Sequence, residues 1–222
     1  MNNVETADIA DLKERILLSA IKEFGYRGYS AASTNAIVQD AGVSKGLLFH
    51  YYGNKEKLFS ACVDYVFRQI GEYFREHLGF PDADIFDRMK FWLRVKMDFC
   101  RDNPLLMGLA IKLWDTGYRQ EVAQFIQDLT GAVPDGESRR YASEFPEVSY
   151  ALLIKDADVA KYDNDVELER VVDYVWILLN ACWDRYSDLY NDDPYRIAES
   201  IEEYLAEADV ILDLIRRGAA AQ

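Results

Sequence analysis

The chain has 222 residues, half of them apolar and 14% aromatic, so it can form one large or two modest cores and is not a disordered protein. Its formal net charge of −14, taken as a bulk property, argues against a nucleic-acid partner. No apolar run approaches 18 residues, and the first residues lack the basic-then-apolar layout of a secretory signal, so we expect a cytoplasmic protein.

The first predicted element is an amphipathic helix over residues 7–25. Its apolar residues recur at steps of three and four, which is the spacing of one face of an α-helix. These residues are Ile9, Leu12, Ile16, Leu17, Ala20, Ile21 and Phe24. Two glycines, Gly25 and Gly28, follow, and we expect them to end the helix.

Residues 33–52 predict two short helices joined by a tight turn. The first begins at Ser33 or Thr34, either of which can accept a hydrogen bond from the free N–H groups of a first turn. It ends at Gly42, because glycine readily adopts the left-handed conformation that closes a helix. Ser44 caps the second helix, which covers residues 45–52. This is the layout of a helix-turn-helix, although many helical hairpins with a glycine turn bind nothing.

The second helix carries polar and aromatic side chains that a core does not need. At 3.6 residues per turn, Leu48 and Tyr52 share one face, which we expect to pack inward. The other side chains suit DNA. We expect Lys45 and Tyr51 to bind phosphates and His50 to bind a base edge or a phosphate. We expect Leu47 to contact the methyl group of a thymine.

Gly46 lies in the first turn of the same helix, where it destabilises the helix by about 1 kcal/mol relative to Ala. Without a Cβ at this position, the positively polarised helix N-terminus and its free N–H groups can approach a phosphate closely. We therefore include Gly46 among the expected DNA-binding residues.

The N-terminal part of the chain resembles the DNA-binding domain of the tetracycline-repressor (TetR) family over about residues 10–70. The matching residues are Ile16, Phe24, Gly28, Thr34, Ile37, Val38, the run Ala41 to Gly46, the run Phe49 to Tyr52, Lys55 and Leu58. The resemblance implies an all-α protein of about nine or ten helices. A helix-turn-helix domain of three helices would occupy residues 1–54, and a larger helical domain for effector binding and dimerisation would occupy residues 55–222.

The resemblance also assigns contacts with DNA. The second helix of the pair would lie in the major groove, and Thr34, Ser44 and Lys55 would hold phosphates. Leu47 stands where the family commonly has a small polar residue, and Phe49 where it commonly has Tyr. Because Phe49 has no hydroxyl group to give to a phosphate, a packing role and a DNA role both stay open.

The rest of the chain predicts helices and no strands. A long helix over residues 55–78 would begin beside the DNA and end in the body. Asp82 or Asp84 would cap a helix that contains residues 85–100, and Pro104 would begin a short apolar helix that ends near residue 114. The later expectations are a helix at 118–130, a loop at 131–136, two helical stretches within 137–162, and long helices at 165–189 and 195–217.

The last two helices are predicted to form a dimer interface. The helix over residues 165–189 has an apolar stripe too wide for a helix covered on one side only. Two such helices from each of two subunits would form a four-helix interface, and an internal core is the alternative. The expected interface residues are Val175, Leu179, Trp183, Tyr186, Ile201, Leu205 and Leu212.

The negative charge is confined to the body. Residues 1–57 hold seven acids and seven bases, which leaves 32 acids and 18 bases in residues 58–222. A neutral head on an acidic body would discourage wrong orientations on DNA, because phosphates repel the body. The alternative is an acidic surface that only aids solubility.

Catalysis has little support in the sequence. His50 and His77 are the only histidines, and no Cys-x-x-Cys, His-Glu-x-x-His, phosphate-binding glycine loop or Gly-x-Ser-x-Gly elbow occurs. We therefore expect no enzyme, no metal and no cofactor. The three cysteines, Cys62, Cys100 and Cys182, are predicted to be buried free thiols.

The predicted function is that of a sequence-specific, DNA-binding transcriptional regulator, a repressor that a small effector releases from a palindromic operator. A helical protein-interaction module without sequence-specific DNA binding is the alternative. Family bodies commonly bind small molecules, so the resemblance implies a pocket in the aromatic middle segment, where core packing is the other interpretation. The candidate pocket residues are Phe91, Trp92, Met97, Met107, Trp114 and Phe125. Because the body is acidic, we expect an apolar or cationic effector that shifts the helix over residues 55–78.

Overall fold

A computed structural model describes residues 3–77, 79, 81–115, 168–188, 196 and 199–219. Within these residues the protein is all-α, as predicted. The helices are α1 (Asn3–Ala31), α2 (Thr34–Ala41), α3 (Lys45–Tyr52), α4 (Lys55–His77), α5 (Ile85–Asp102), α6 (Pro104–Asp115), α9 (Leu168–Asp188) and α10 (Ile201–Ala219). The predictions for 118–130, 131–136 and 137–162 lie outside the described residues. None of the described helices combines the length and apolarity needed to cross a membrane.

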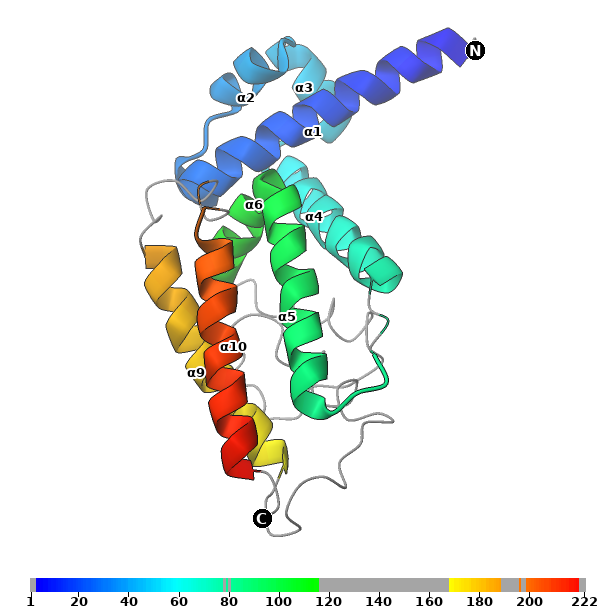
Figure 1. Cartoon of the computed structure of the whole chain (residues 1–222). Helices are drawn as coiled ribbons and strands as arrows, with labels where there is room; N and C mark the ends of the chain where they lie inside the picture. The colour runs from blue at the N-terminus through cyan, green and yellow to red at the C-terminus, as the bar shows by residue number, and fades with distance from the viewer. Residues whose placement is uncertain are drawn as a thin grey trace.

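The described helices form a small head and a longer body (Figure 1). Helices α1, α2 and α3 lie together at one end, with α1 running across the top of the molecule. Helix α4 leads from the head into the body, where α5, α9 and α10 run along the long axis. Helix α6 packs against both α1 and α4, so the head and the body share an extensive contact in addition to the chain connection.

Helix α1 is longer than the sequence predicts. Gly25 is buried and helical, so the expectation that it ends the helix is wrong. The break comes at Gly28, whose φ of 69° and ψ of 169° lie outside the helical region. The short turn after this kink folds Tyr29 onto Phe59 of α4, with 5.0 Å between the ring centroids. Tertiary packing therefore extends the helix past the first glycine.

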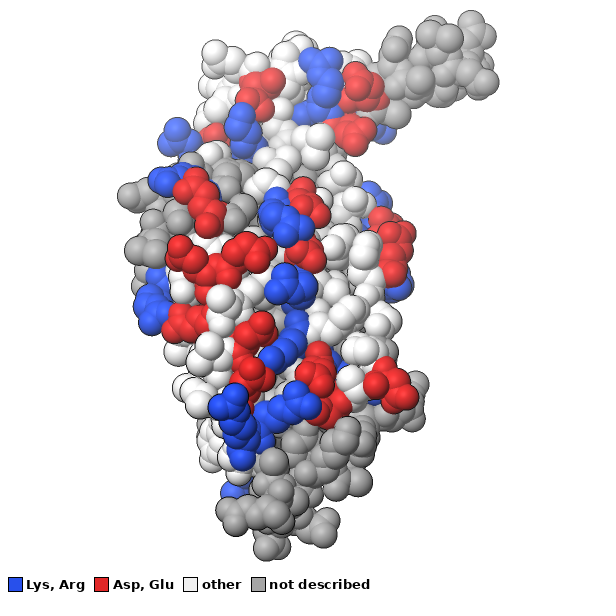
Figure 2. Space-filling model, in the orientation of Figure 1, with Lys and Arg blue, Asp and Glu red and all other residues white. Residues whose placement is uncertain are grey.

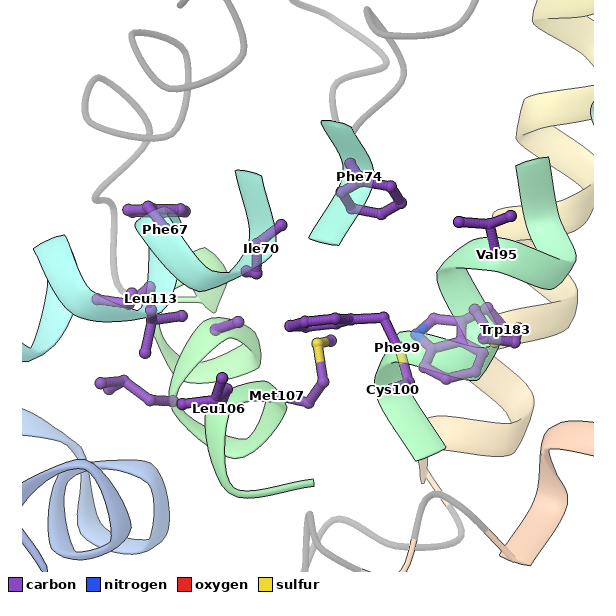
Figure 3. Close-up of a cluster of buried hydrophobic side chains, with 14 of the residues drawn as sticks. Phe67, Ile70, Phe74, Val95, Phe99, Cys100, Leu106, Met107, Leu113 and Trp183 are labelled. Atoms are coloured by element: carbon purple, nitrogen blue, oxygen red, sulfur yellow. The ribbon is translucent and has the colours of Figure 1, made fainter. Parts of the chain in front are cut away.

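A single cluster of buried apolar side chains runs through the head and the body. Figure 3 shows Phe67, Ile70 and Phe74 of α4 on one side of this cluster, opposite Phe99 of α5 and Met107 of α6. The three cysteines are free and buried, as predicted. Burial raises the pKa of the Cys182 thiol to about 11, which keeps this thiol protonated at neutral pH.

Helices α5 and α10 are joined by a ladder of ion pairs. Lys90 lies 2.8 Å from Asp213, and Arg101 lies 3.9 Å from Glu202. Arg216, near the end of α10, pairs with Asp84 and with Asp87 at the start of α5. The order of these pairs makes the two helices antiparallel, and Figure 2 shows the interleaved charges along this face.

Asp84, one of the two predicted caps, begins α5. Its Oδ1 accepts hydrogen bonds from the N–H groups of Phe86 and Asp87, at 3.0 and 3.1 Å. Its side chain is 1% exposed and also pairs with Arg216. Asp82, the other candidate, is exposed. The same carboxylate thus caps α5 and ties it to α10.

We predict that Asp84→Ala lowers the free energy of unfolding by about 2 kcal/mol, because it removes an N-cap and one partner of a mostly buried ion pair. Asp82→Ala is the matched control, and its effect should stay within about 0.5 kcal/mol. Urea unfolding at one fixed protein concentration measures both values. Equal midpoints for the two variants would show that Asp84 does not stabilise the α5–α10 contact.

Candidate nucleic-acid interface

The short helix α2 is closed by its own end residues. The Ser33 hydroxyl accepts a hydrogen bond from the N–H of Ala36 at 3.5 Å, so Ser33 is the cap and Thr34 is the first helical residue. Gly42 follows the helix in the left-handed conformation, with φ 65° and ψ 38°. Both ends are therefore set by the residues that the sequence indicated.

Side chains of α1 hold both ends of α2 as well. At the N-terminal end, the Ser33 N–H donates a hydrogen bond to the Glu23 carboxylate at 2.9 Å. At the C-terminal end, the Arg15 guanidinium donates one to the Ala41 carbonyl. The Lys22 ammonium donates another to the Asp40 carboxylate at 2.8 Å. The hydrogen bond from Lys22 lowers the pKa of Asp40. A carboxylate at the N-terminal end and cations at the C-terminal end also complement the dipole of α2.

Helix α3 is fixed on its inner side. The Ser44 hydroxyl accepts a hydrogen bond from the N–H of Leu47 at 3.2 Å, and its own proton stays available to an outside acceptor. Leu48 is fully buried, as predicted. Phe49 is half-buried and packs against the core, which favours the packing role that the sequence left open.

The outer side of α3 presents its first turn. Lys45, Gly46 and His50 are exposed, and Leu47 and Tyr51 are half-buried. A Cβ added to Gly46 would lie no closer than 3.9 Å to any neighbouring atom, so packing within the protein does not require glycine there. The missing side chain leaves the N-terminus of α3 open on the side away from the core.

Lys13 of α1 contacts two tyrosines of α3. Its ammonium lies 5.2 Å from the centre of the Tyr51 ring, and its carbonyl accepts a hydrogen bond from the Tyr52 hydroxyl at 2.9 Å. Burial raises the pKa of Tyr52 to about 12, so its hydroxyl stays neutral and serves the inward contact. Lys13 could not be predicted to make these contacts, because a lysine on the polar face of a helix carries no signal for them in the sequence.

Two predicted phosphate contacts lie at the edges of this surface. Thr34 is half-buried at the start of α2. The Lys55 ammonium lies 3.3 Å from the Ser30 carbonyl and 4.9 Å from the centre of the Tyr29 ring. An ammonium has three N–H donors, so one bond to Ser30 leaves donors for a phosphate.

The expected effector residues do not all share one surface. Trp92, Met97 and Met107 are buried and Phe91 is half-buried, whereas Phe125 and the side chain of Trp114 lie outside the described residues. Trp92 and Met97 are five residues apart, which places them on different sides of α5. Lys96 is only 6% exposed, which the sequence does not indicate, because helical lysines are usually solvent-exposed.

The expected dimer residues need a correction. Six of them are at most 4% exposed and pack inside the chain: Val175, Leu179, Trp183, Ile201, Leu205 and Leu212. Such side chains cannot also cover a second chain, so this choice of residues is wrong. The seventh, Tyr186, is half-buried and donates a hydrogen bond to Glu207. The exposed large apolar side chains of these two helices are Tyr174, Ile177, Leu178, Val210 and Leu214.

The described residues contain no group of three or more His, Cys, Asp or Glu side chains that could hold a metal ion. The exposed surface around α3 presents hydrogen-bond donors, cations and apolar side chains. These groups match the phosphates and base edges of DNA.

Comparisons with known proteins agree with this surface. The family model for bacterial regulatory proteins, tetR family, matches residues 16–62. The transcriptional regulator BetI of Stenotrophomonas maltophilia is 25% identical over 112 residues, which cover 50% of this chain and 55% of that protein. The transcriptional repressor AcnR of Corynebacterium jeikeium is 35% identical over 72 residues, which cover 32% of this chain and 38% of that protein. The matches thus span about half or less of these curated relatives.

The fold likeness extends further than the sequence likeness. The crystal structure of a TetR-like transcriptional regulator from a Rhodococcus species matches with a TM-score of 0.58 at 21% identity, and the match covers 93% of this chain and 94% of that one. The helix-turn-helix geometry, the family model and this fold agree. Residues 16–62 therefore match the model for bacterial regulatory proteins, tetR family, and this matched part holds the helix-turn-helix.

Proposed function

We propose that the protein is a repressor that binds a palindromic operator as a homodimer and leaves it when a small molecule binds the body. The observation that carries this proposal is the exposed outer face of α3. Its Lys45, Gly46 and His50 face outward, while Leu48 on the opposite side anchors the helix in the core. A helix held from behind, with an open N-terminus and the Lys45 ammonium in front, suits the major groove.

Some of the proposed contacts position the protein on the DNA backbone, and the others read the base sequence. Thr34, Ser44, Lys45, Tyr51 and Lys55 hold phosphates, as do the free N–H groups at the N-terminus of α3 beside Gly46. His50 and Leu47 reach base edges, and Leu47 packs on a thymine methyl group. The proposed boundary between the DNA-binding head and the body lies between residues 54 and 55, where α4 begins.

The proposed dimer uses the outer faces of α9 and α10. Tyr174, Ile177 and Leu178 lie on one stripe of α9, and Val210 and Leu214 lie one turn apart on α10. Trp183 packs on Tyr204 with 5.1 Å between ring centroids, and Figure 1 shows the two helices antiparallel. That register brings the two exposed stripes to the same level, as a single apolar surface for a second copy.

Selection of bound fragments from a random DNA pool tests the central proposal. The selected sites should be palindromic, with half-site centres about one helical turn, or a multiple of it, apart. Footprinting of a selected site should then show protection of both half-sites. Recovery of unrelated fragments with no shared site would contradict a sequence-specific regulator.

We predict that Lys45→Ala weakens binding to operator and to random DNA by a similar factor, because a phosphate contact carries no sequence information. The slope of log affinity against log salt concentration should fall by about one unit. Arg75→Ala is the charge-matched control, since it is exposed on α4 about 30 Å along the helix from Lys55. Fluorescence anisotropy across a salt series measures the DNA affinity of both variants. An unchanged slope for Lys45→Ala would show that Lys45 does not bind a phosphate.

We predict that Leu47→Ala changes the preference for one base of the operator more than it changes the overall affinity for DNA. Loss of the contact with a thymine methyl group should relax selection at one position of each half-site, by about tenfold or less. Repeating the random-pool selection with this variant measures the effect position by position. If its operator keeps every preference of the unmodified protein, Leu47 does not read a base.

We predict that Leu178→Glu and Leu214→Glu separate the dimer without unfolding the chain, because both side chains are exposed within one chain, at 46% and 62%. Leu179→Glu is the contrasting control, because the Leu179 side chain is 1% exposed and a charge there should unfold the body. Sedimentation equilibrium and circular dichroism distinguish the two effects. Folded dimers of both exposed-face variants would rule out this surface.

A further inference from the structure

Lys55, at the start of α4, is held in place by the last turn of α1. Its ammonium donates a hydrogen bond to the Ser30 carbonyl at 3.3 Å and lies 4.9 Å from the centre of the Tyr29 ring. Neither the carbonyl nor the ring carries a net charge, so these two contacts orient the ammonium without neutralising it. The cation therefore keeps its attraction for an anion.

The presence of a lysine at this position does not follow from the stability of α4. Lys55 is the first residue of the helix, where the positive end of the helix dipole repels a cation. The first turn is already served by Glu56 and by the Asn54 side chain, which accepts a hydrogen bond from the Lys57 N–H at 2.8 Å. A lysine that is unfavourable for its own helix, yet anchored by two contacts from another helix, points to a role in binding.

Gly28 makes the turn that anchors Lys55. Its φ of 69° and ψ of 169° belong to a backbone region that essentially only glycine occupies. A Cβ at this position would meet no atom within 4 Å, so the requirement for glycine comes from the backbone conformation and not from lack of space. The break in α1 at Gly28 is thus what places Tyr29 and Ser30 beside the start of α4.

Two buried phenylalanines fix the Tyr29 ring. Its centroid lies 5.0 Å from that of Phe59 of α4 and 6.2 Å from that of Phe24 of α1, and the two phenylalanine rings are 4.9 Å apart. Phe24 and Phe59 are at most 4% exposed, whereas Tyr29 is 36% exposed. The core therefore holds the Tyr29 ring at the surface, beside the Lys55 ammonium.

We propose that Tyr29 is a positioning residue for DNA binding, which together with the Ser30 carbonyl holds the Lys55 ammonium ready for a phosphate of the DNA backbone. This inference rests on the proposed phosphate contact of Lys55 and adds the groups that orient it. Lysine has a flexible stem of four carbon atoms, so fixing it in advance reduces the entropy that is lost on binding. The anchoring turn also leads directly into α2, so one short segment joins the proposed phosphate contacts of Thr34 and Lys55.

A double-mutant cycle on DNA affinity tests the proposal. Tyr29→Leu removes the ring but keeps an apolar side chain against the two phenylalanines. We expect it to weaken binding to the operator and to a random duplex about threefold, because a phosphate contact is independent of base sequence. In a Lys55→Ala background the same substitution should change the affinity by less than about 1.5-fold, because no ammonium is left to orient. Fluorescence anisotropy at one fixed salt concentration measures all four proteins.

Three further variants separate positioning from packing. Tyr29→Phe keeps the face of the ring and should retain the affinity of the unmodified protein. Gly28→Ala strains the turn and should weaken binding about threefold, again only while Lys55 is present. Tyr26→Leu is the matched control, because it makes the same change at an exposed tyrosine three residues earlier in α1, and it should leave the affinity unchanged. Circular dichroism checks that each variant is folded.

Equal losses from Tyr29→Leu with and without Lys55 would overturn the proposal, because they would show that the ring only supports the fold. A loss in Tyr29→Phe as large as that in Tyr29→Leu, the same loss in Tyr26→Leu, or no loss in Tyr29→Leu would overturn it as well. These outcomes concern this inference alone. Equal affinity of the unmodified protein for selected and random duplexes would instead disprove the proposed function, whereas the coupling between Tyr29 and Lys55 is measured on either duplex.

Discussion

The packing of α1 is the contact on which the rest of the structure depends. Its buried residues, Ile16, Ala20, Ile21 and Phe24, form the support for α2 and α4, and the helix also packs against α6 of the body. The recognition surface on α3 contributes one fully buried side chain, Leu48, so its position is inherited from the helices beneath it. Tyr52 adds a hydrogen bond to the backbone of α1 at Lys13. The proposed DNA-reading helix, of eight residues, is thus oriented by a helix that itself carries none of the proposed contacts.

The sequence predicted most where local chemistry decides the structure. Ser33, Gly42, Ser44 and Asp84 act through their own backbone neighbours, so caps and turns could be located from residue type alone. Gly25 was assigned wrongly because burial against distant residues overrides the low helix propensity of glycine. The inner and outer faces of α9 were assigned wrongly for a related reason. The apolar stripe of α9 is wide enough to include both the core face and an exposed face, and the sequence does not show where one ends and the other begins.

The charges of the body have a role that composition could not reveal. The ladder between α5 and α10 joins residues more than 100 positions apart, so its pairing follows from the fold and not from local spacing. Some of the acids in the body therefore neutralise cations of the same chain, so repulsion from DNA depends on the excess of acids and not on their total number. The interior holds charged side chains as well, because Asp84, Arg88 and Lys96 are buried. Net charge describes the surface that DNA meets and says little about the interior.

The contacts of α1 with the two ends of α2 determine how the head opens. A helix of eight residues is too short to be stable alone, and here Glu23, Lys22 and Arg15 of α1 satisfy groups at its two ends. Fraying of α2 must therefore break bonds to α1, and the two helices open as one cooperative unit whose amide hydrogens exchange with solvent at related rates. A substitution in α1, for example at Arg15, would then reduce the order of the proposed DNA-reading surface, although Arg15 itself lies outside the proposed contacts.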